Sequence, residues 1–145
     1  MPFWLEGWIE VARPSEAPDE LSWFGVVDLG AIVDVADDDS ERLFGLSKAC
    51  ISGEKSTASL ASGRGTPPSP SAQVRRALGE IETHEAKFGN GEMGGFTWAL
   101  WAEIRDCALT VVPDDSQWTL PFEFARALEE RFGADRVRFV VWFNW

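Results

Sequence analysis

The chain ends with the stretch RVRFVVWFNW, residues 136–145, and this stretch decides the fold. Because side chains alternate between the two faces of a strand, one face carries Val137, Phe139, Val141 and Phe143. The other face is also apolar beyond Arg138, since Val140 and Trp142 lie there. A strand that is apolar on both faces is typical of the middle of a sheet. We therefore predict a central strand at this end of the chain.

Further strands are expected on either side of this one in space. Residues 3–11 alternate between apolar and polar positions, which predicts a half-buried strand. Residues 23–35 are rich in β-branched side chains and predict a second strand, broken near Gly30, that pairs antiparallel with the first. Residues 96–98 predict a short extended segment that leads into helical turns through Arg105, and residues 108–112 predict a short strand.

Helices are expected between these strands. Ser71 begins an amphipathic segment that runs to Phe88, with an apolar stripe at Val74, Ala77, Leu78, Ile81 and Phe88. Thr119 has the character of an N-cap for a helix that ends at Gly133. Asp38 and Glu41 have capping-box spacing at the start of a helix expected to end near Cys50.

The order of these elements predicts an α+β fold with an antiparallel or mixed sheet and helices packed mainly on one face. The 145 residues suit a single acidic domain spanning residues 1–145. Residues 51–71 are rich in Ser, Gly, Pro and Thr and predict a long loop, of a length typical of functional or mobile segments.

Composition narrows the class of partner. The chain has 24 acidic and 13 basic residues, a net charge of -11, which disfavours direct binding to nucleic acid because phosphates are normally neutralised by Lys and Arg. No apolar run is long enough for a membrane span and no signal peptide is apparent, so we expect a cytoplasmic protein. Cys50 and Cys107 are far apart and are expected to be buried free thiols.

Familiar catalytic and cofactor motifs fail on their context. The glycines of residues 89–94 match G-x-G-x-x-G, but they follow a predicted helix, whereas a dinucleotide site needs them after a strand. Residues 53–56 lack the glycine before Lys55 that a P-loop needs. His84 is the only histidine and is expected to be half-buried and structural. We identify no catalytic residue, cofactor or metal.

Acidic and aromatic residues are the remaining candidates for function. An acidic cluster precedes the first helix and consists of Asp37, Asp38, Asp39 and Glu41. The cluster lacks the glycine and terminal Glu of a calcium loop, so helix capping and a solvated patch that another protein can recognise are the preferred interpretations. The chain also has eight Trp and ten Phe, and we expect one or two Trp to reach the surface as anchors for a partner.

Four segments resemble a family of small uncharacterised proteins from phages and bacteria. They are LFGL at 43–46, ASGRGTPPSP at 61–70, TWALWAEI at 97–104 and VRFVVWFN at 137–144. The resemblance covers the last two-thirds of the chain and implies an association with mobile elements. Relatives often carry histidines just before the Trp segment, where this chain has Gly95 and Phe96. The family has no established activity.

Three hypotheses follow. The leading one is a phage- or mobile-element-associated protein that binds a protein partner with a basic surface, for example as an inhibitor of a host defence complex such as CRISPR interference. The second is an immunity protein or antitoxin against a basic toxin. The third is an enzyme or small-ligand binder with a pocket at Arg64, Trp98 and Trp101, where the guanidinium binds an anion and an indole stacks on a ring.

Overall fold

A four-stranded antiparallel sheet organises the computed structural model, which describes residues 4–14, 21–34, 36–45, 59–89, 93–107 and 110–144. The strand order is β2-β1-β4-β3, and each neighbouring pair is antiparallel. The α+β fold predicted from the sequence is therefore confirmed. The bounds of the strands are Trp4–Pro14 (β1), Leu21–Asp28 (β2), Met93–Leu100 (β3) and Val137–Asn144 (β4).

The C-terminal strand β4 occupies the middle of the sheet, as its two apolar faces predict. It pairs with β1 on one side, in a register that sets Leu5 opposite Phe143, and with β3 on the other. Every residue from Val137 to Phe143 is buried. The strand is thus covered on both faces, and the helices of the two faces supply that cover.

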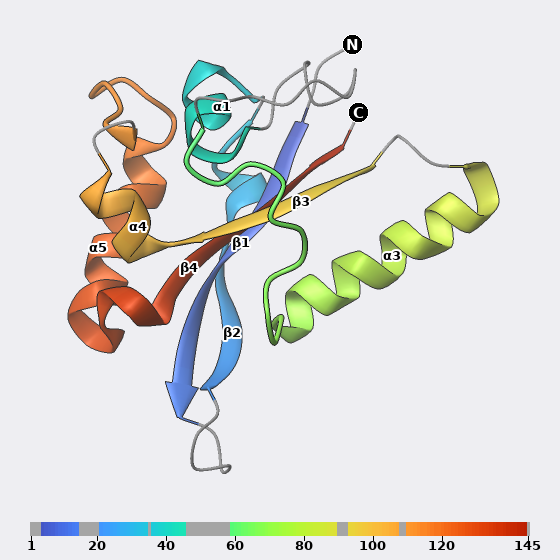
Figure 1. Ribbon diagram of the computed structural model, residues 1–145, viewed down its shortest axis with the longest axis horizontal. Helices are drawn as coiled ribbons and strands as arrows, with labels where there is room; N and C mark the ends of the chain where they lie inside the picture. The colour runs from blue at the N-terminus through green and yellow to red at the C-terminus, as the bar shows by residue number, and fades with distance from the viewer. Residues whose placement is uncertain are drawn as a thin grey trace.

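The helices lie on both faces of the sheet, but most of them lie on one. Figure 1 shows α1, α4 and α5 on one side of the sheet and α3 crossing the other side. The 3-10 helices η1 and η3 precede α1 and β4 respectively. The bounds of the helices are Leu29–Ala31 (η1), Asp38–Phe44 (α1), Ala72–Phe88 (α3), Trp101–Asp106 (α4), Thr119–Phe132 (α5) and Ala134–Arg136 (η3).

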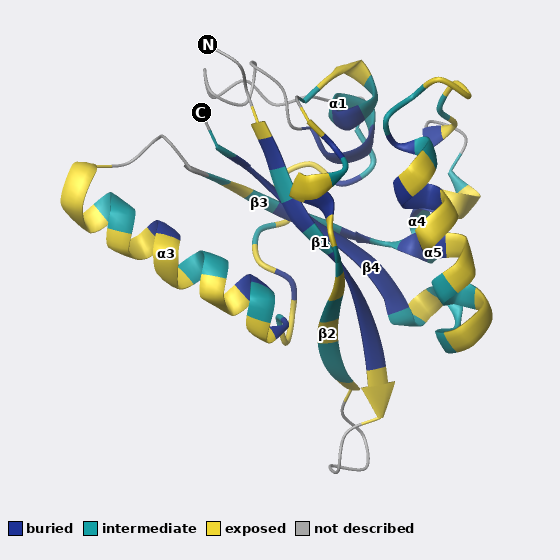
Figure 2. Ribbon diagram, turned by 180° about the vertical axis from the view of Figure 1, so that it is seen from behind, coloured by how far each residue is buried: buried dark blue, intermediate teal, exposed yellow. Residues whose placement is uncertain are grey.

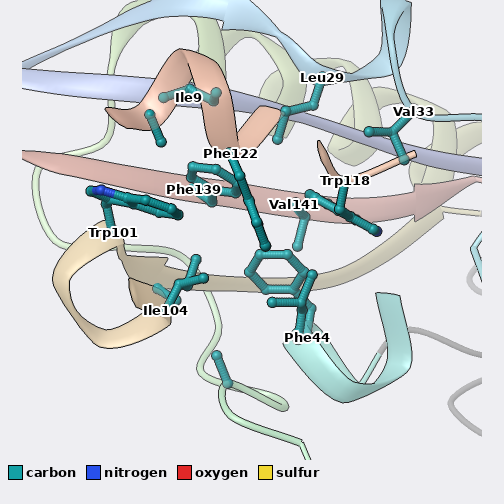
Figure 3. Close-up of a cluster of buried hydrophobic side chains, with 14 of the residues drawn as sticks. Ile9, Leu29, Val33, Phe44, Trp101, Ile104, Trp118, Phe122, Phe139 and Val141 are labelled. Atoms are coloured by element: carbon teal, nitrogen blue, oxygen red, sulfur yellow. The ribbon is translucent and has the colours of Figure 1, made fainter. Parts of the chain in front are cut away.

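Aromatic rings form the centre of the core between the sheet and α1, α4 and α5 (Figure 3). The Phe139 ring of β4 lies about 6 Å, centroid to centroid, from four others, which are those of Phe44, Trp101, Trp118 and Phe122. The two buried indoles keep hydrogen bonds, since Trp118 Nε1 donates to Ser40 Oγ and Trp101 Nε1 donates to Glu129 Oε2, both at 2.9 Å. Indoles that are buried and satisfied in this way stabilise the core.

Several predicted boundaries were wrong. Helix α1 ends at Phe44, where Gly45 adopts a left-handed conformation, and residues 46–58, which include Cys50 and the start of the predicted loop, lie outside the described residues. Residues 110–112 form no strand, and residues 108–109 also lie outside the described part. Strand β2 ends at Asp28, whose side chain caps η1, so the break near Gly30 is real and no strand continues over residues 29–34.

The long amphipathic helix α3 is confirmed, with Ser71 as its N-cap. Its stripe is buried at Val74 and Ile81, but Phe88 is 66% exposed, which is a correction. Figure 2 shows the C-terminal end of α3 reaching away from the sheet, so the last turn has no apolar surface to cover. No helix among the described residues combines the length and the apolar character that crossing a bilayer requires.

Candidate functional site

The predicted acidic cluster forms the N-terminal turn of α1. Asp37 is the N-cap, because its Oδ1 accepts hydrogen bonds from the backbone N and the hydroxyl of Ser40 at 2.9 Å. The capping-box assignment to Asp38 was therefore off by one residue. Asp39 forms an ion pair with Arg42, Asp38 is exposed and Glu41 is half-buried. Asp37 and Asp39 thus serve capping and dipole compensation, and Asp38 is left exposed.

A second acidic segment lies against this turn, and no sequence pattern pointed to it. Gln117 Nε2 donates to Asp37 Oδ2 at 2.9 Å, and Ser116 Oγ donates to Asp39 Oδ2 at 2.7 Å. Gln117 Oε1 also accepts from the backbone N of Asp34 at 2.9 Å. These bonds join segments about 80 residues apart in the chain. They place the turn that contains the exposed Asp114 and Asp115 beside the N-terminus of α1 (Figure 1).

Exposed apolar side chains follow directly in the first turns of α5. Leu120 is 45% exposed and Phe124 is 41% exposed, with the exposed Glu123 between them in sequence. Trp118, which is fully buried, anchors this end of α5 through its bond to Ser40. We use the term acidic surface for these two apolar residues together with six exposed carboxylates, those of Asp34, Asp37, Asp38, Asp114, Asp115 and Glu123.

The charges of the acidic surface are not compensated within the described part of the chain. None of its six carboxylates forms an ion pair with another described residue, and the neighbouring Arg42 is engaged by Asp39. Unpaired surface charges of one sign increase the magnitude of the local electrostatic potential, which speeds the approach of an oppositely charged partner. The acidic surface therefore combines steering charge with apolar anchors.

Arg64 and Trp98 lie together, as the third hypothesis requires, but Arg64 is already paired. Its guanidinium forms a two-point ion pair with Glu103, with N–O distances of 2.8 and 3.0 Å, and lies 5.5 Å from the centre of the Trp98 ring. Glu103 also accepts from the backbone N of Leu100, and the hydrogen bond from Arg64 is the main cause that lowers the pKa of Glu103. The sequence analysis missed Glu103 as a partner, which leaves Arg64 little charge to offer an anion.

Trp101 does not join Arg64 and Trp98, which corrects the predicted pocket. Trp101 is 1% exposed and lies in the aromatic core, on the face covered by α4 and α5. Trp98 lies on the opposite face, because it pairs with Val140 of β4. The sequence analysis predicted a change from an extended segment to a helix after Trp98, and the structure places it at Leu100. The consequence, that the two indoles lie on opposite faces of the sheet, was missed.

The remaining candidates have structural surroundings. His84 is half-buried with its ring 4.9 Å from Phe88, and Cys107 is a half-buried free thiol. Gly89 follows helix α3 and Gly94 lies in a strand, the reverse of the dinucleotide arrangement, while residues 90–92 lie outside the described part. Among the described residues, no group of three or more His, Cys, Asp and Glu side chains is arranged to hold a metal ion.

Comparison of the chain with protein-family models, curated proteins and solved structures found no match. The resemblance to small phage and bacterial proteins therefore stays a prediction. Function has to be argued from the surface chemistry of this chain.

Proposed function

We propose that this protein binds another protein through its acidic surface, and that the contacted surface of the partner is basic. The observation that carries the proposal is the hydrogen-bonded junction of Asp37 and Asp39 with Ser116 and Gln117. Unpaired carboxylates come from both of the joined segments, and the exposed side chains of Leu120 and Phe124 follow Gln117 in the first turns of α5. Charges at the rim accelerate association and desolvated aromatic anchors slow dissociation, so the two kinds of residue have complementary roles.

The proposed partner is a host nucleoprotein complex of a defence system such as CRISPR interference, acting in the cytoplasm. A protein groove that holds nucleic acid is rich in Lys and Arg, and an acidic protein surface can occupy it in place of phosphates. The net charge of -11 fits such a competitor and opposes direct binding to nucleic acid. The resemblance to phage proteins supports the same setting.

The first experiment measures binding of the purified protein to host nucleoprotein complexes, with and without their nucleic acid, by biolayer interferometry at low and physiological salt. We expect binding to the empty complexes, competition by DNA or RNA, and weaker binding as salt rises. Binding to a basic toxin in a parallel panel, with none to nucleoprotein complexes, would assign the protein to the immunity class instead. Failure to bind any host nucleoprotein complex at low salt refutes the inhibitor role.

Matched variants then test the surface itself. Asp114→Asn with Asp115→Asn should slow association about threefold or more at low salt, whereas Glu82→Gln with Glu130→Gln, which removes the same charge from other exposed positions, should change it little. Phe124→Ala should speed dissociation about tenfold. The control is Phe88→Ala, the same truncation at another exposed phenylalanine. Equal effects from the variants and their controls would show that this surface is not the contact.

A further inference from the structure

A groove lies between α3 and the sheet, on the face opposite the aromatic core. Its volume is about 530 Å³, within the range of small-molecule sites. Strand β1, the turn around η1, one side of α3 and Trp142 of β4 line it. Figure 1 shows α3 crossing this face at a slant. Because α1, α4 and α5 lie on the other face, the groove is separate from the acidic surface.

Two indoles held in fixed positions contribute to the lining of the groove. Trp142 is 3% exposed, stacks on Phe96 with ring centroids 4.9 Å apart, and donates its Nε1–H to Glu6 Oε2 at 3.1 Å. Trp8 is half-buried and packs beside Gly25, where an added Cβ would come within 3.0 Å of the indole and of Gln73. A groove with ordered indoles can receive a flat or alkyl ligand, and the negative face of an indole attracts a cation.

The charged lining is predominantly negative. Glu6, Asp28 and Glu80 line the groove together with one cation, Arg76. Glu80 and Arg76 are 3.6 Å apart and largely exposed, so their pair is weak. Within the described part of the chain neither Glu6 nor Asp28 forms an ion pair, and both have atoms within 4 Å of the place where a Cβ on Gly30 would lie. Glu6 and Asp28 therefore make one negative corner.

These features select the class of ligand. An anion is repelled by the carboxylates, and the described carboxylates do not converge as the ligands of one metal ion must. A cation with an alkyl or planar body uses both the carboxylates and the indoles. We propose that this groove binds an organic cation, an alkyl guanidinium or alkylammonium, with its charged end at Glu6 and Asp28 and its body against Trp8.

Small side chains keep the groove open for such a ligand. Gly30 and Ala77 both belong to its lining, on opposite sides. Ala77 is on α3, where leucine is an equally good helix former, so Ala77→Leu fills the groove without altering the helix or the charges. This substitution separates the shape of the site from its electrostatics.

The test uses agmatine and spermidine as probes and N,N'-diacetylputrescine as the neutral control. Calorimetry measures binding, and the indole N–H signals in NMR spectra report where the probe binds. Both cations should bind, and the neutral control should not. Glu6→Gln with Asp28→Asn should weaken binding at least tenfold, and Ala77→Leu should abolish it. Glutamine keeps an acceptor for Trp142 and asparagine keeps one for the backbone N of Gly30, so the fold is retained, which the melting temperature verifies.

The control pair Glu82→Gln with Glu130→Gln removes the same charge from exposed positions outside the groove and should leave binding unchanged. A blocked peptide, acetyl-Gly-Arg-Gly-amide, distinguishes the two sources of the cation. Tighter binding of the peptide assigns the groove to an arginine side chain of a protein, and tighter binding of agmatine assigns it to a free metabolite.

No binding of either cation at millimolar concentration, equal binding of the neutral control, or equal loss in the control pair overturns the proposal. Asp114→Asn with Asp115→Asn leaves this site intact, so the two proposals fail independently.

Discussion

Replacing Arg138 by methionine should destabilise this protein more than any substitution at its surface. Arg138 and Glu10 are 1% and 0% exposed, and Nε lies 2.6 Å from Oε1. The guanidinium also donates to the backbone carbonyls of Pro68 and Ser69 at 2.8 and 3.2 Å. Glu10 Oε2 accepts from the backbone N of Ser71 at 2.7 Å. One buried ion pair thus ties two central strands to the segment that enters α3.

The magnitude follows from the charge that the substitution leaves behind. Removing one partner of a buried pair costs about 3–5 kcal/mol, because the other charge stays desolvated and unpaired. At roughly 3 to 4 °C for each kcal/mol in a chain of this size, the melting temperature should fall by about 10–20 °C.

Calorimetry and urea unfolding measure this loss of stability, and hydrogen exchange should show faster exchange at residues 67–71. Arg76→Met is the matched control, because the Arg76 side chain is 84% exposed and its pair with Glu80 is weak. Glu10→Gln with Arg138→Met should cost less than the sum of the single changes. The reasoning is refuted if Arg138→Met melts within a few degrees of Arg76→Met.

Two further predictions concern the loop before α3 and the edge of the sheet. The Arg64 hydrogen bond lowers the pKa of Glu103, so the stabilisation from this group is complete above the ordinary value of 4.5 and is lost as the pH falls through the lowered pKa. Urea unfolding should show Glu103→Gln to be less stable by up to about 1 kcal/mol at pH 7 and to converge with wild type in acid; a constant difference would contradict this. The Gln73 amide bonds both the backbone N and O of Gly25 in edge strand β2, at 3.2 Å each. Gln73→Ala should cost about 1–2 kcal/mol and promote association through the freed edge, which analytical ultracentrifugation tests; a sedimentation profile equal to that of the wild type would contradict it.

Sequence patterns predicted the elements that have a long and regular pattern of apolar residues. The apolar character of both faces of residues 137–143 placed β4 in the sheet centre, and Ser71 with Val74 and Ile81 marked α3. The short elements were predicted less well. Residues 110–112 are β-branched at all three positions, but they join no strand of the sheet, and the Thr110 hydroxyl instead donates to the backbone carbonyls of Ile104 and Cys107. Strand propensity alone does not create a ladder.

Contacts between distant segments could not be predicted from the sequence. Arg138 is the one charged residue in an apolar strand, and nothing in the pattern identified Glu10, 128 positions away, as its partner. The acidic cluster before α1 was visible, but its extension depends on Gln117, which carries no charge and matches no motif. Arg64 and Trp98 were rightly associated, whereas Trp101 was separated from them because the chain changes from strand to helix at Leu100.

The acidity of the chain divides into two kinds of carboxylate, and the division locates both proposed sites. Glu10, Asp39, Glu103 and Glu129 each bind an arginine and hold elements together. Among the described carboxylates without such a partner, one group lies at the N-terminus of α1 and in the turn before α5, and Glu6 and Asp28 line the α3 groove. Others, such as Glu82 and Glu130, lie outside both groups. Asp37, Asp28 and Glu6 also accept hydrogen bonds within the fold, from Ser40, Gly30 and Trp142, but none of the three forms an ion pair with a described residue. In both proposals a cationic partner would supply the missing positive charge, and because the proposed sites lie on opposite faces of the sheet, each can be tested without the other.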